Sequence, residues 1–199
     1  MVFGMTNIAD KVQDFLVYLK YEKQYSSATL KNYSLDLIKF ITYLKVININ
    51  MVSQITSDHI QNYINKLNRS GLIATSLARK TSSNRSFFNY MIRKKMIKIN
   101  PSKKIIVPKK LQKLPYILSI EQVDLLCSIP SSSFASIRDK AMIELMYSSG
   151  LRLSEITSLN ADSVSPKDRM LSVIGKGGKQ RYLPMGMKAI QALNKWTLM

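Results

Sequence analysis

Histidine and cysteine are almost absent from this 199-residue chain, which contains only His59 and Cys127. A single cysteine excludes an internal disulfide framework and fits a reducing compartment. The pair cannot supply the usual four ligands of a zinc site, and a triad built on histidine would have only His59. The twelve acidic residues form no dense cluster that suits a divalent cation. The sequence therefore disfavours metal-dependent nuclease chemistry.

Long apolar segments are also missing. No run approaches the roughly 18–20 apolar residues that a bilayer-spanning helix needs. The first ten residues, MVFGMTNIAD, lack the cationic start and apolar core of a signal peptide. We therefore expect a cytoplasmic protein. A role at a membrane surface is a weaker alternative, because no basic segment carries a broad face of Trp, Phe and Leu.

Negative charge is scarce as well, since twelve Asp and Glu stand against thirty Lys and Arg, a net charge of +18. Residues 1–113 carry a net +15, and residues 79–113 contain twelve basic residues and no acidic one. A polyanionic partner explains this unevenness better than solubility does, because solubility would spread both signs over the chain. A protein that merely coats nucleic acid is disfavoured, since no helix interleaves basic and aromatic residues as a stacking platform would.

Apolar periodicity predicts four amphipathic helices in the first hundred residues, joined by short polar turns into a small bundle. Their predicted buried faces are Ile8, Val12, Phe15, Leu16 and Leu19; Leu30, Tyr33, Leu37, Phe40, Ile41 and Leu44; Ile60, Tyr63, Ile64 and Leu67; and Leu77, Phe88, Met91 and Ile92. We expect this domain to span residues 1–97. Residues 98–117, rich in proline and lysine without helical period, are predicted to form a basic linker.

A second unit is expected over residues 118–199. Ser119 and Gln122 form a capping-box pattern, and a helix that is apolar nearly all round, residues 138–149, stops at Gly150. A short helix follows over residues 154–159. Residues 170–174 and 180–183 alternate like strands around a glycine-rich turn, so we predict an antiparallel hairpin. Residues 187–199 are predicted to form a last helix. The predicted fold is mainly α, with a small β-hairpin in the second unit.

Two segments of the second unit have compositions that indicate DNA contacts, the first with a phosphate and the second, a tight glycine-built turn, with a DNA groove. Arg152 lies between a helix-ending glycine and a new helix, and Glu155 shares its helical face and is placed to hold the guanidinium. Lys176 lies on the glycine-built turn, which lacks the ending of a P-loop. Alone, the first segment is more often an ordinary surface ion pair, and the second is more often a soluble turn.

Together, SGLRLSEITSL (149–159) and VIGKGGKQRYLP (173–184) resemble the first half of the catalytic domain of tyrosine recombinases, the phage-integrase superfamily. Residues 15–44 and 78–102 resemble the family's four-helix, SAM-like core-binding domain. Residues 109–126 resemble the linker and catalytic-domain start of its Xer-type branch. The resemblance implies strand exchange without metal or other cofactor, through a 3′-phosphotyrosyl link to duplex DNA, with recombinase protomers assembled on the recombination site. It does not decide between chromosome segregation and the integration of a phage or mobile element.

The resemblance also implies roles for single residues. Arg152 would bind non-bridging phosphate oxygens, Glu155 would support it, and Lys176 would protonate the leaving 5′-oxygen. The family's second arginine motif and nucleophilic tyrosine are not found after residue 184, so we expect a truncated member that does not cleave DNA alone. The predicted DNA contacts are Arg79, Lys80, Arg85, Arg93, Lys94, Lys95, Lys109, Lys110, Lys113, Lys179 and Arg181.

Two functions thus remain open. The first is a tyrosine recombinase represented by its DNA-binding part and half of its active site. The second is a non-catalytic duplex-DNA-binding fragment or regulator that occupies recombination sites.

Overall fold

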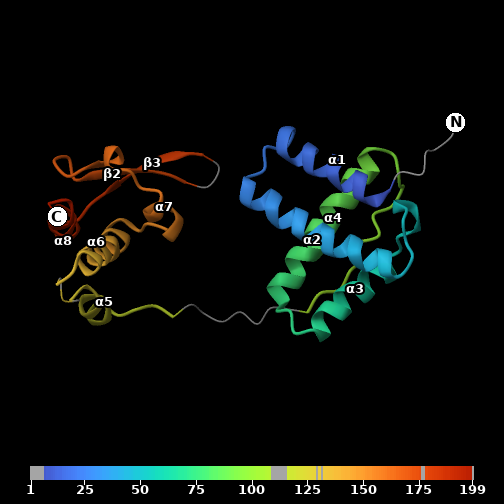
Figure 1. The fold of residues 1–199 in the computed structure, drawn as a ribbon, viewed down its shortest axis with the longest axis horizontal. Coiled ribbons are helices and arrows are strands. Elements are labelled where there is room, and N and C mark those ends of the chain that lie inside the picture. Colours follow the sequence, from blue (N-terminus) through green and yellow to red (C-terminus); the bar gives the residue numbers. More distant parts are fainter. Residues whose placement is uncertain (1–6, 109–115, 129, 131, 176–177, 199) are drawn as a thin grey trace. The chain divides into compact units, whose positions relative to one another are not determined.

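The computed structural model describes residues 7–108, 116–128, 130, 132–175 and 178–198 (Figure 1). The chain divides into two compact units, Met1–Lys113 and Leu114–Met199, and each has its own hydrophobic core. No helix in these described ranges is long and apolar enough to cross a membrane.

The first unit is a bundle of four α-helices, as the apolar periodicity predicts. They are α1 (Ile8–Tyr21), α2 (Ser27–Val46), α3 (Ser57–Arg69) and α4 (Ala74–Arg93), with a 3₁₀ turn at Val52–Gln54. Thr56 caps α3 by accepting the backbone N–H of His59, and the His59 ring accepts the backbone N–H of Thr56 in return. The single histidine therefore has a structural place at a helix start.

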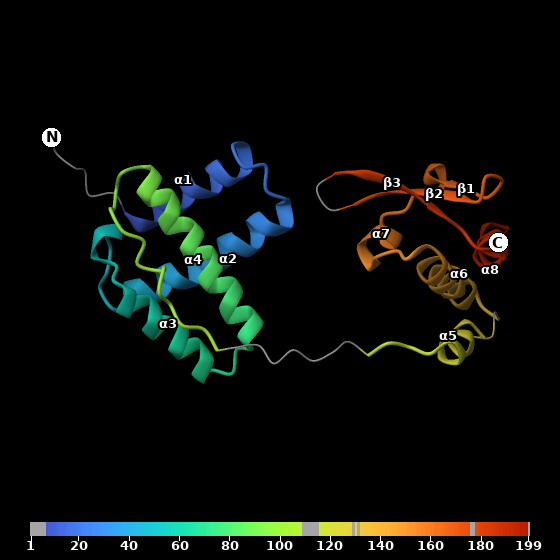
Figure 2. The same ribbon diagram turned by 180° about the vertical axis from the view of Figure 1, so that it is seen from behind.

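The core of the bundle is aromatic. Phe15, Phe40, Phe87 and Phe88 are all fully buried, and the Phe87 and Phe88 ring centroids lie 5.2 Å apart. Figure 2 shows α4 running across α2, so that the residues of α4 reach both α1 and α3. The predicted buried face of α4 omitted Phe87, and Ile92 is only partly buried.

The segment after α4 packs on this bundle. Ile105 is buried, and Ile97 and Val107 lie against the core. Asn100 donates from its side-chain amide to the backbone oxygen of Arg85, and Gln61 bonds both the N–H and the carbonyl of residue 106. The structure thus attaches residues 97–107 to the first unit, whereas the sequence predicts a linker from residue 98. Side-chain amides hold this irregular segment, and apolar periodicity does not reveal such bonds.

The second unit places a small sheet over helices. Its elements are α5 (Ile120–Cys127), α6 (Phe134–Ser149), α7 (Leu153–Thr157), a 3₁₀ turn (Ala161–Ser163), β1 (Val164–Ser165), β2 (Met170–Ile174), β3 (Gln180–Pro184) and α8 (Met187–Thr197). The strands are antiparallel in the order β1-β2-β3, which confirms the predicted hairpin and adds a two-residue strand. The core joins Leu145 of α6, Leu171 and Val173 of β2, and Leu193 of α8.

Gly150 and the hairpin register determine where the functional side chains lie. Gly150 ends α6 in the left-handed conformation, with φ of 61°, which is why glycine suits this position. In the hairpin, Val173 pairs with Arg181 and Leu171 pairs with Leu183. Because side chains alternate along a strand, Arg181 lies on the sheet face that carries Leu183. The helix α6 itself is buried along one side only, with Tyr147 exposed, so it is less enclosed than its composition suggests.

Candidate active site and nucleic-acid interface

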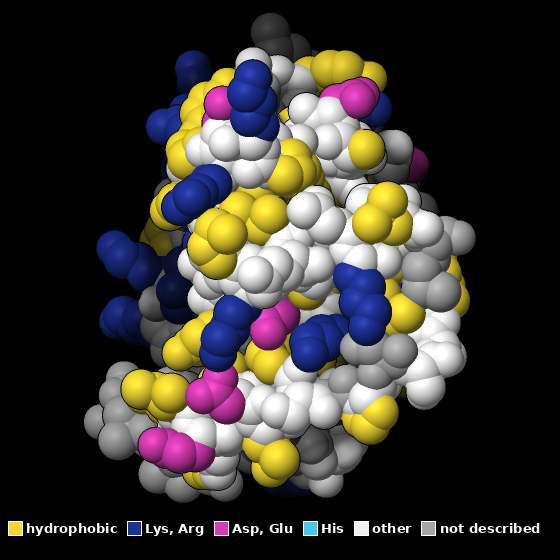
Figure 3. Space-filling model, turned by 90° about the vertical axis from the view of Figure 1, so that its left-hand side faces the viewer, with side chains coloured by type: hydrophobic (Ala, Val, Ile, Leu, Met, Phe, Trp, Pro, Cys, Tyr) yellow, Lys and Arg dark blue, Asp and Glu magenta, His cyan; other side chains and the backbone are white. Residues whose placement is uncertain are grey.

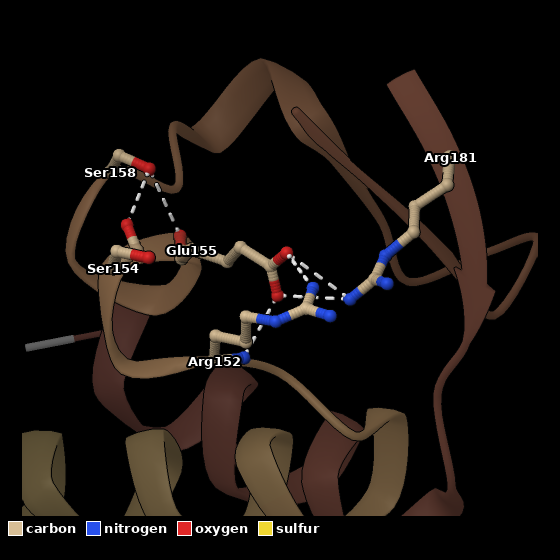
Figure 4. A network of polar contacts seen from close by, with 5 residues as sticks. All are labelled: Arg152, Ser154, Glu155, Ser158 and Arg181. Atoms are coloured by element: carbon tan, nitrogen blue, oxygen red, sulfur yellow. Dashed lines mark hydrogen bonds and ion pairs between the residues drawn. The ribbon is translucent and has the colours of Figure 1, made fainter. Parts of the chain in front are cut away.

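Arg152 and Glu155 form a closed pair at the start of α7. The Arg152 backbone N–H donates to Glu155 Oε2 at 2.8 Å, and Arg152 Nη1 donates to Glu155 Oε1 at 2.8 Å (Figure 4). The Glu155 side chain is 4% exposed, whereas that of Arg152 is 63% exposed. The carboxylate is therefore the fixed partner, and the guanidinium is held at the surface.

A second arginine reaches the same carboxylate from the hairpin. Arg181 Nη2, on β3, lies 3.0 Å from Glu155 Oε2 and 3.2 Å from Oε1. The sequence predicts Arg181 as a DNA contact and does not predict this ion pair. Strand alternation gives the missing signal, because Arg181 must share a sheet face with Leu183 and thus lie toward the helices.

The charge state of Glu155 follows from these contacts. The N–H of Arg152 lowers the pKa of the Glu155 carboxyl most, and the Arg152 side chain and the charge of Arg181 lower it further, against the opposing effect of burial. Glu155 is thus ionised at neutral pH. One negative and two positive charges leave a net positive charge at the site, which suits a phosphate oxygen.

The loop around Glu155 is held by serine hydroxyls. Ser158 Oγ donates to the backbone oxygen of Ser154 at 2.8 Å and to that of Glu155 at 3.2 Å (Figure 4). The Ser154 carbonyl thus gains a side-chain partner, while the Glu155 carbonyl also accepts the backbone N–H of Ser158 at 3.3 Å.

The predicted acid Lys176 lies outside the described residues. The turn that carries it is framed by the Gly175 N–H, which donates to the Lys179 carbonyl at 2.7 Å, and by the Ile174–Gln180 strand pair. Lys179 is exposed. The role of Lys176 stays a prediction.

The basic residues of the first unit do not all face solvent. Lys80 is buried, because its side chain is 6% exposed and its Nζ lies 2.8 Å from Asp36 Oδ1. Burying a lysine requires such a partner, and the charge is then not available to a phosphate. We therefore remove Lys80 from the set of DNA contacts, as a correction to the sequence-based prediction. The helix α4 turns the Lys80 side chain toward Asp36 of α2 and away from solvent.

The remaining predicted contacts on α4 and its end stay candidates. Arg79 also pairs with Asp36 but keeps 42% of its side chain exposed. Arg85, Lys94 and Lys95 are exposed, and Arg93 donates to the Tyr18 hydroxyl while its guanidinium lies 5.5 Å from the Tyr18 ring. Lys94 lies 5.5 Å from the ring of Tyr90. Lys109, Lys110 and Lys113 lie outside the described residues.

One surface of the second unit carries acidic as well as basic side chains. The face formed by α5, α6 and α8 mixes both signs (Figure 3). It includes an open hollow lined by Asp124, Cys127, Lys140, Glu144 and Lys188, and Lys188 pairs with Asp124 at 3.2 Å. Two carboxylates at this hollow make it a poor surface for a phosphate backbone.

No metal centre is found in the part of the chain that the structure describes, where no group of three or more His, Cys, Asp or Glu lies close enough to hold an ion.

Comparison with known protein families matches both units. A family model described as the phage integrase N-terminal SAM-like domain matches residues 12–95, and the phage integrase family model matches residues 117–198. Tyrosine recombinase XerC of Proteus mirabilis is 36% identical over 188 residues, which cover 94% of this chain and 61% of that protein. Its counterpart in Histophilus somni is 40% identical over 185 residues, covering 93% and 63%.

Solved structures share the fold at low sequence identity. A lambda integrase dimer bound to a COC′ core site gives a TM-score of 0.69 at 18% identity, covering 96% of this chain and 69% of that chain. The Tn1549 transposon integrase in complex with transposon right end DNA also gives 0.69, at 15% identity, covering 93% and 64%. The XerH recombinase bound to a palindromic difH substrate gives 0.65 at 17%, covering 94% and 57%.

The chain spans about 58–64% of the length of the XerC relatives. Both of its units match the same family in order, and the relatives agree over nearly all of its 199 residues. The chain therefore belongs to the phage integrase family of tyrosine recombinases, and within it the chain is similar to the Xer recombinases.

Proposed function

We propose that this chain supplies the DNA-binding part and the first half of the active site of a site-specific DNA recombinase. The observation that carries the proposal is the exposed Arg152 guanidinium, fixed on the buried, ionised Glu155. A guanidinium held in this way stabilises the charge that builds on phosphoryl oxygens in the transition state.

The proposed substrate is duplex DNA that contains a recombination site. Three structural relatives are recombinases or integrases in complex with DNA, which supports the choice of substrate. In this proposal Arg152 binds the scissile phosphate, Glu155 holds Arg152, and Lys176 protonates the leaving 5′-oxygen. Further recombinase protomers would assemble on the same site. Because the substrate is DNA, we propose the cytoplasm as the place of action.

The nucleophile is not assigned to this chain. Tyr182 lies on β3, six positions after Lys176, and its exposed hydroxyl lies within 3.5 Å of Gln180 on the same strand. Neither the family's second arginine motif nor its tyrosine is found after residue 184. The alternative function, a non-catalytic DNA-binding regulator, is not favoured, because the named relatives are recombinases.

Salt-dependent DNA binding tests the first half of the proposal with the chain as it is. If roughly six to ten phosphates are contacted, the affinity for duplex DNA falls by about 10³–10⁵ between about 50 and 200 mM salt. Fluorescence anisotropy with a labelled duplex measures this. Replacing Arg85 and Lys95 by Gln should lower the salt slope by about two. The matched control replaces two exposed lysines of the second unit, Lys167 and Lys195, and should leave the slope unchanged.

Cleavage tests the second half. In a chimaera, residues 1–199 are followed by the remaining C-terminal segment of the Proteus mirabilis relative. With a recombination-site duplex of that relative, we expect a covalent protein–DNA adduct on denaturing gels. If the unmutated chimaera folds and binds DNA but forms no adduct, the assignment of half an active site to this chain is wrong.

A further inference from the structure

The Glu155 carboxylate joins two arginines that come from different elements. Oε1 accepts from Arg152 Nη1 and Arg181 Nη2, and Oε2 accepts from the Arg152 backbone N–H and again from Arg181 Nη2. Arg152 is the N-cap residue of α7, whereas Arg181 lies in β3, the strand that follows the turn of Lys176. One buried carboxylate thus connects the α6–α7 junction to the hairpin.

We propose that Arg181 is a positioning residue, which acts on the phosphate only through Glu155 and Arg152. It fixes the Glu155 carboxylate from the hairpin side and so sets the direction of the Arg152 guanidinium and its separation from the hairpin turn. The proposal rests on the function proposed above for Arg152, and it replaces the sequence-based prediction that Arg181 contacts DNA.

The burial of the two arginines supports different roles for them. The Arg181 side chain is 38% exposed, against 63% for Arg152. The Nε of Arg181 is buried and has no hydrogen-bond partner in the part of the chain that the structure describes. Because its Nε is buried and its Nη2 contacts a buried carboxylate, this side chain has little freedom to reorient toward a DNA backbone.

The sheet limits Arg181 further. It pairs with Val173 of β2, whose side chain is buried in the core of the second unit. The strand therefore fixes the root of Arg181, and Glu155 fixes its tip. Arg152, by contrast, is anchored at its backbone and at Nη1, and its exposed side faces solvent.

Loss of Arg181 changes Glu155 and Arg152 in a defined direction. The carboxylate loses one of its two cations and one side of its hydrogen bonding, so the pKa of Glu155 rises. Neither carboxylate oxygen then accepts a hydrogen bond from Arg181, so both can accept one from the Arg152 guanidinium. The guanidinium therefore turns from its present contact through one nitrogen toward the two-donor geometry that arginine prefers with carboxylates. Its orientation at the surface changes as a result.

Nuclear magnetic resonance on the whole chain tests this without DNA. Arginine side chains labelled with ¹⁵N report each Nε–Hε group, and Arg152→Lys assigns the Arg152 signal by its disappearance. In Arg181→Gln we expect the Arg152 signal to shift and the ¹³Cδ titration of Glu155 to move to higher pH. Arg181→Lys keeps the positive charge but lacks the paired N–H donors of a guanidinium. In this variant the Glu155 titration should return toward its original pH, while the Arg152 signal should remain shifted.

The matched control is Lys167→Gln, which removes one positive charge from the exposed turn between β1 and β2. It should move neither signal. A purely structural role for Arg181 would lower the melting temperature and leave the Arg152 and Glu155 signals of the folded protein in place, and that result overturns the proposal. If Arg181→Gln does not fold, Arg181→Lys decides, because the Arg152 signal must shift in it. None of these measurements uses DNA, so the inference can fail while the proposed function stands, and the reverse also holds.

Discussion

Lys80 and Asp36 form an ion pair inside the first unit, with 2.8 Å between Nζ and Oδ1 and with both side chains almost fully buried. Arg79 contacts the second oxygen of the same carboxylate. The arrangement repeats that of Glu155, since each unit has one buried acid that holds two basic side chains, of which one is much more exposed than the other. Among the ion pairs of the described residues, Asp36 and Glu155 are the two acids that each hold two basic side chains.

The first prediction concerns Asp36→Asn. The change leaves the buried Lys80 ammonium without its counter-charge, and removing one partner of a buried pair destabilises a protein by about 3–5 kcal/mol. We expect that loss in the first unit, measured by hydrogen exchange of the slowest amides of α2 and α4. Asp36→Leu combined with Lys80→Met should restore most of it. Glu22→Gln, at the exposed end of α1, is the control and should stay within about 0.5 kcal/mol.

The second prediction concerns Tyr63. Burial raises the pKa of its phenol to about 12, with a further contribution from Asp36, and its hydroxyl has no hydrogen-bond partner among the described residues. In the unfolded chain this phenol loses its proton near pH 10. The contribution of Tyr63 to stability is therefore fully present below pH 10 and is lost as the pH rises toward 12. Tyr63→Phe should be near neutral at pH 7, because no bond is lost.

The difference in free energy of unfolding between the Tyr63→Phe protein and the unmutated chain should shift in favour of the variant between pH 7 and pH 11. The expected shift is about 1 kcal/mol. Urea unfolding followed by circular dichroism at the two pH values gives the difference. Tyr21→Phe, on the exposed side of α1, should show no such gain. An equal response of the two variants to pH would contradict the burial of the Tyr63 hydroxyl.

The sequence predicts most of the fold because apolar spacing and turn residues record local structure. The four helices of the bundle, Gly150 as the end of α6, and the hairpin around residues 175–179 all follow from such spacing. The partners of buried charges do not. Nothing near Lys80 in the sequence names Asp36, which lies 44 positions earlier, and Arg181 lies 26 positions from Glu155. Composition therefore predicts a basic protein, but only tertiary contacts separate basic residues that face solvent from those that hold the site together.

The third prediction concerns pH and the second unit. The N–H of Arg152, followed by its side chain and Arg181, lowers the pKa of the Glu155 carboxyl in the folded state below its ordinary value of 4.5. Its contribution to stability is therefore present above pH 4.5 and is lost as the pH falls through the lower folded pKa. Glu155→Gln should flatten the acid dependence of unfolding there. Trp196 fluorescence reports this unit, and Asp139→Asn on α6 should keep the original acid dependence.

The fourth prediction concerns Arg152→Ala. In the chain as it is, DNA affinity should fall only modestly and the salt slope should decrease by about one, because one phosphate contact is lost among several. In the chimaera described above, adduct formation should fall by about 10³-fold or more, since an arginine on transferring phosphoryl oxygens is typically worth about 10³–10⁵. The interaction strengthens in the transition state, so cleavage loses far more than binding. Normal cleavage by a folded Arg152→Ala chimaera refutes the assigned role.

The last prediction concerns Lys176, the proposed general acid. Without it the 5′-oxygen must leave as a poor alkoxide, and general acids typically contribute about 10²–10⁴-fold. Lys176→Ala in the chimaera should therefore slow cleavage of ordinary DNA by that range, measured as the rate of adduct formation in a single turnover.

A sulfur substitution separates acid catalysis from mere contact. A substrate with sulfur at the bridging 5′ position leaves as a thiolate, which needs little protonation, so Lys176→Ala should cleave it nearly as fast as the unmutated chimaera does. Lys179, three positions later and exposed, is the internal control. Lys179→Ala removes the same charge from the same hairpin and should weaken DNA binding without selective rescue by sulfur. Rescue of Lys179→Ala, or failure to rescue Lys176→Ala, makes the turn a groove contact, and the proton must then come from another group.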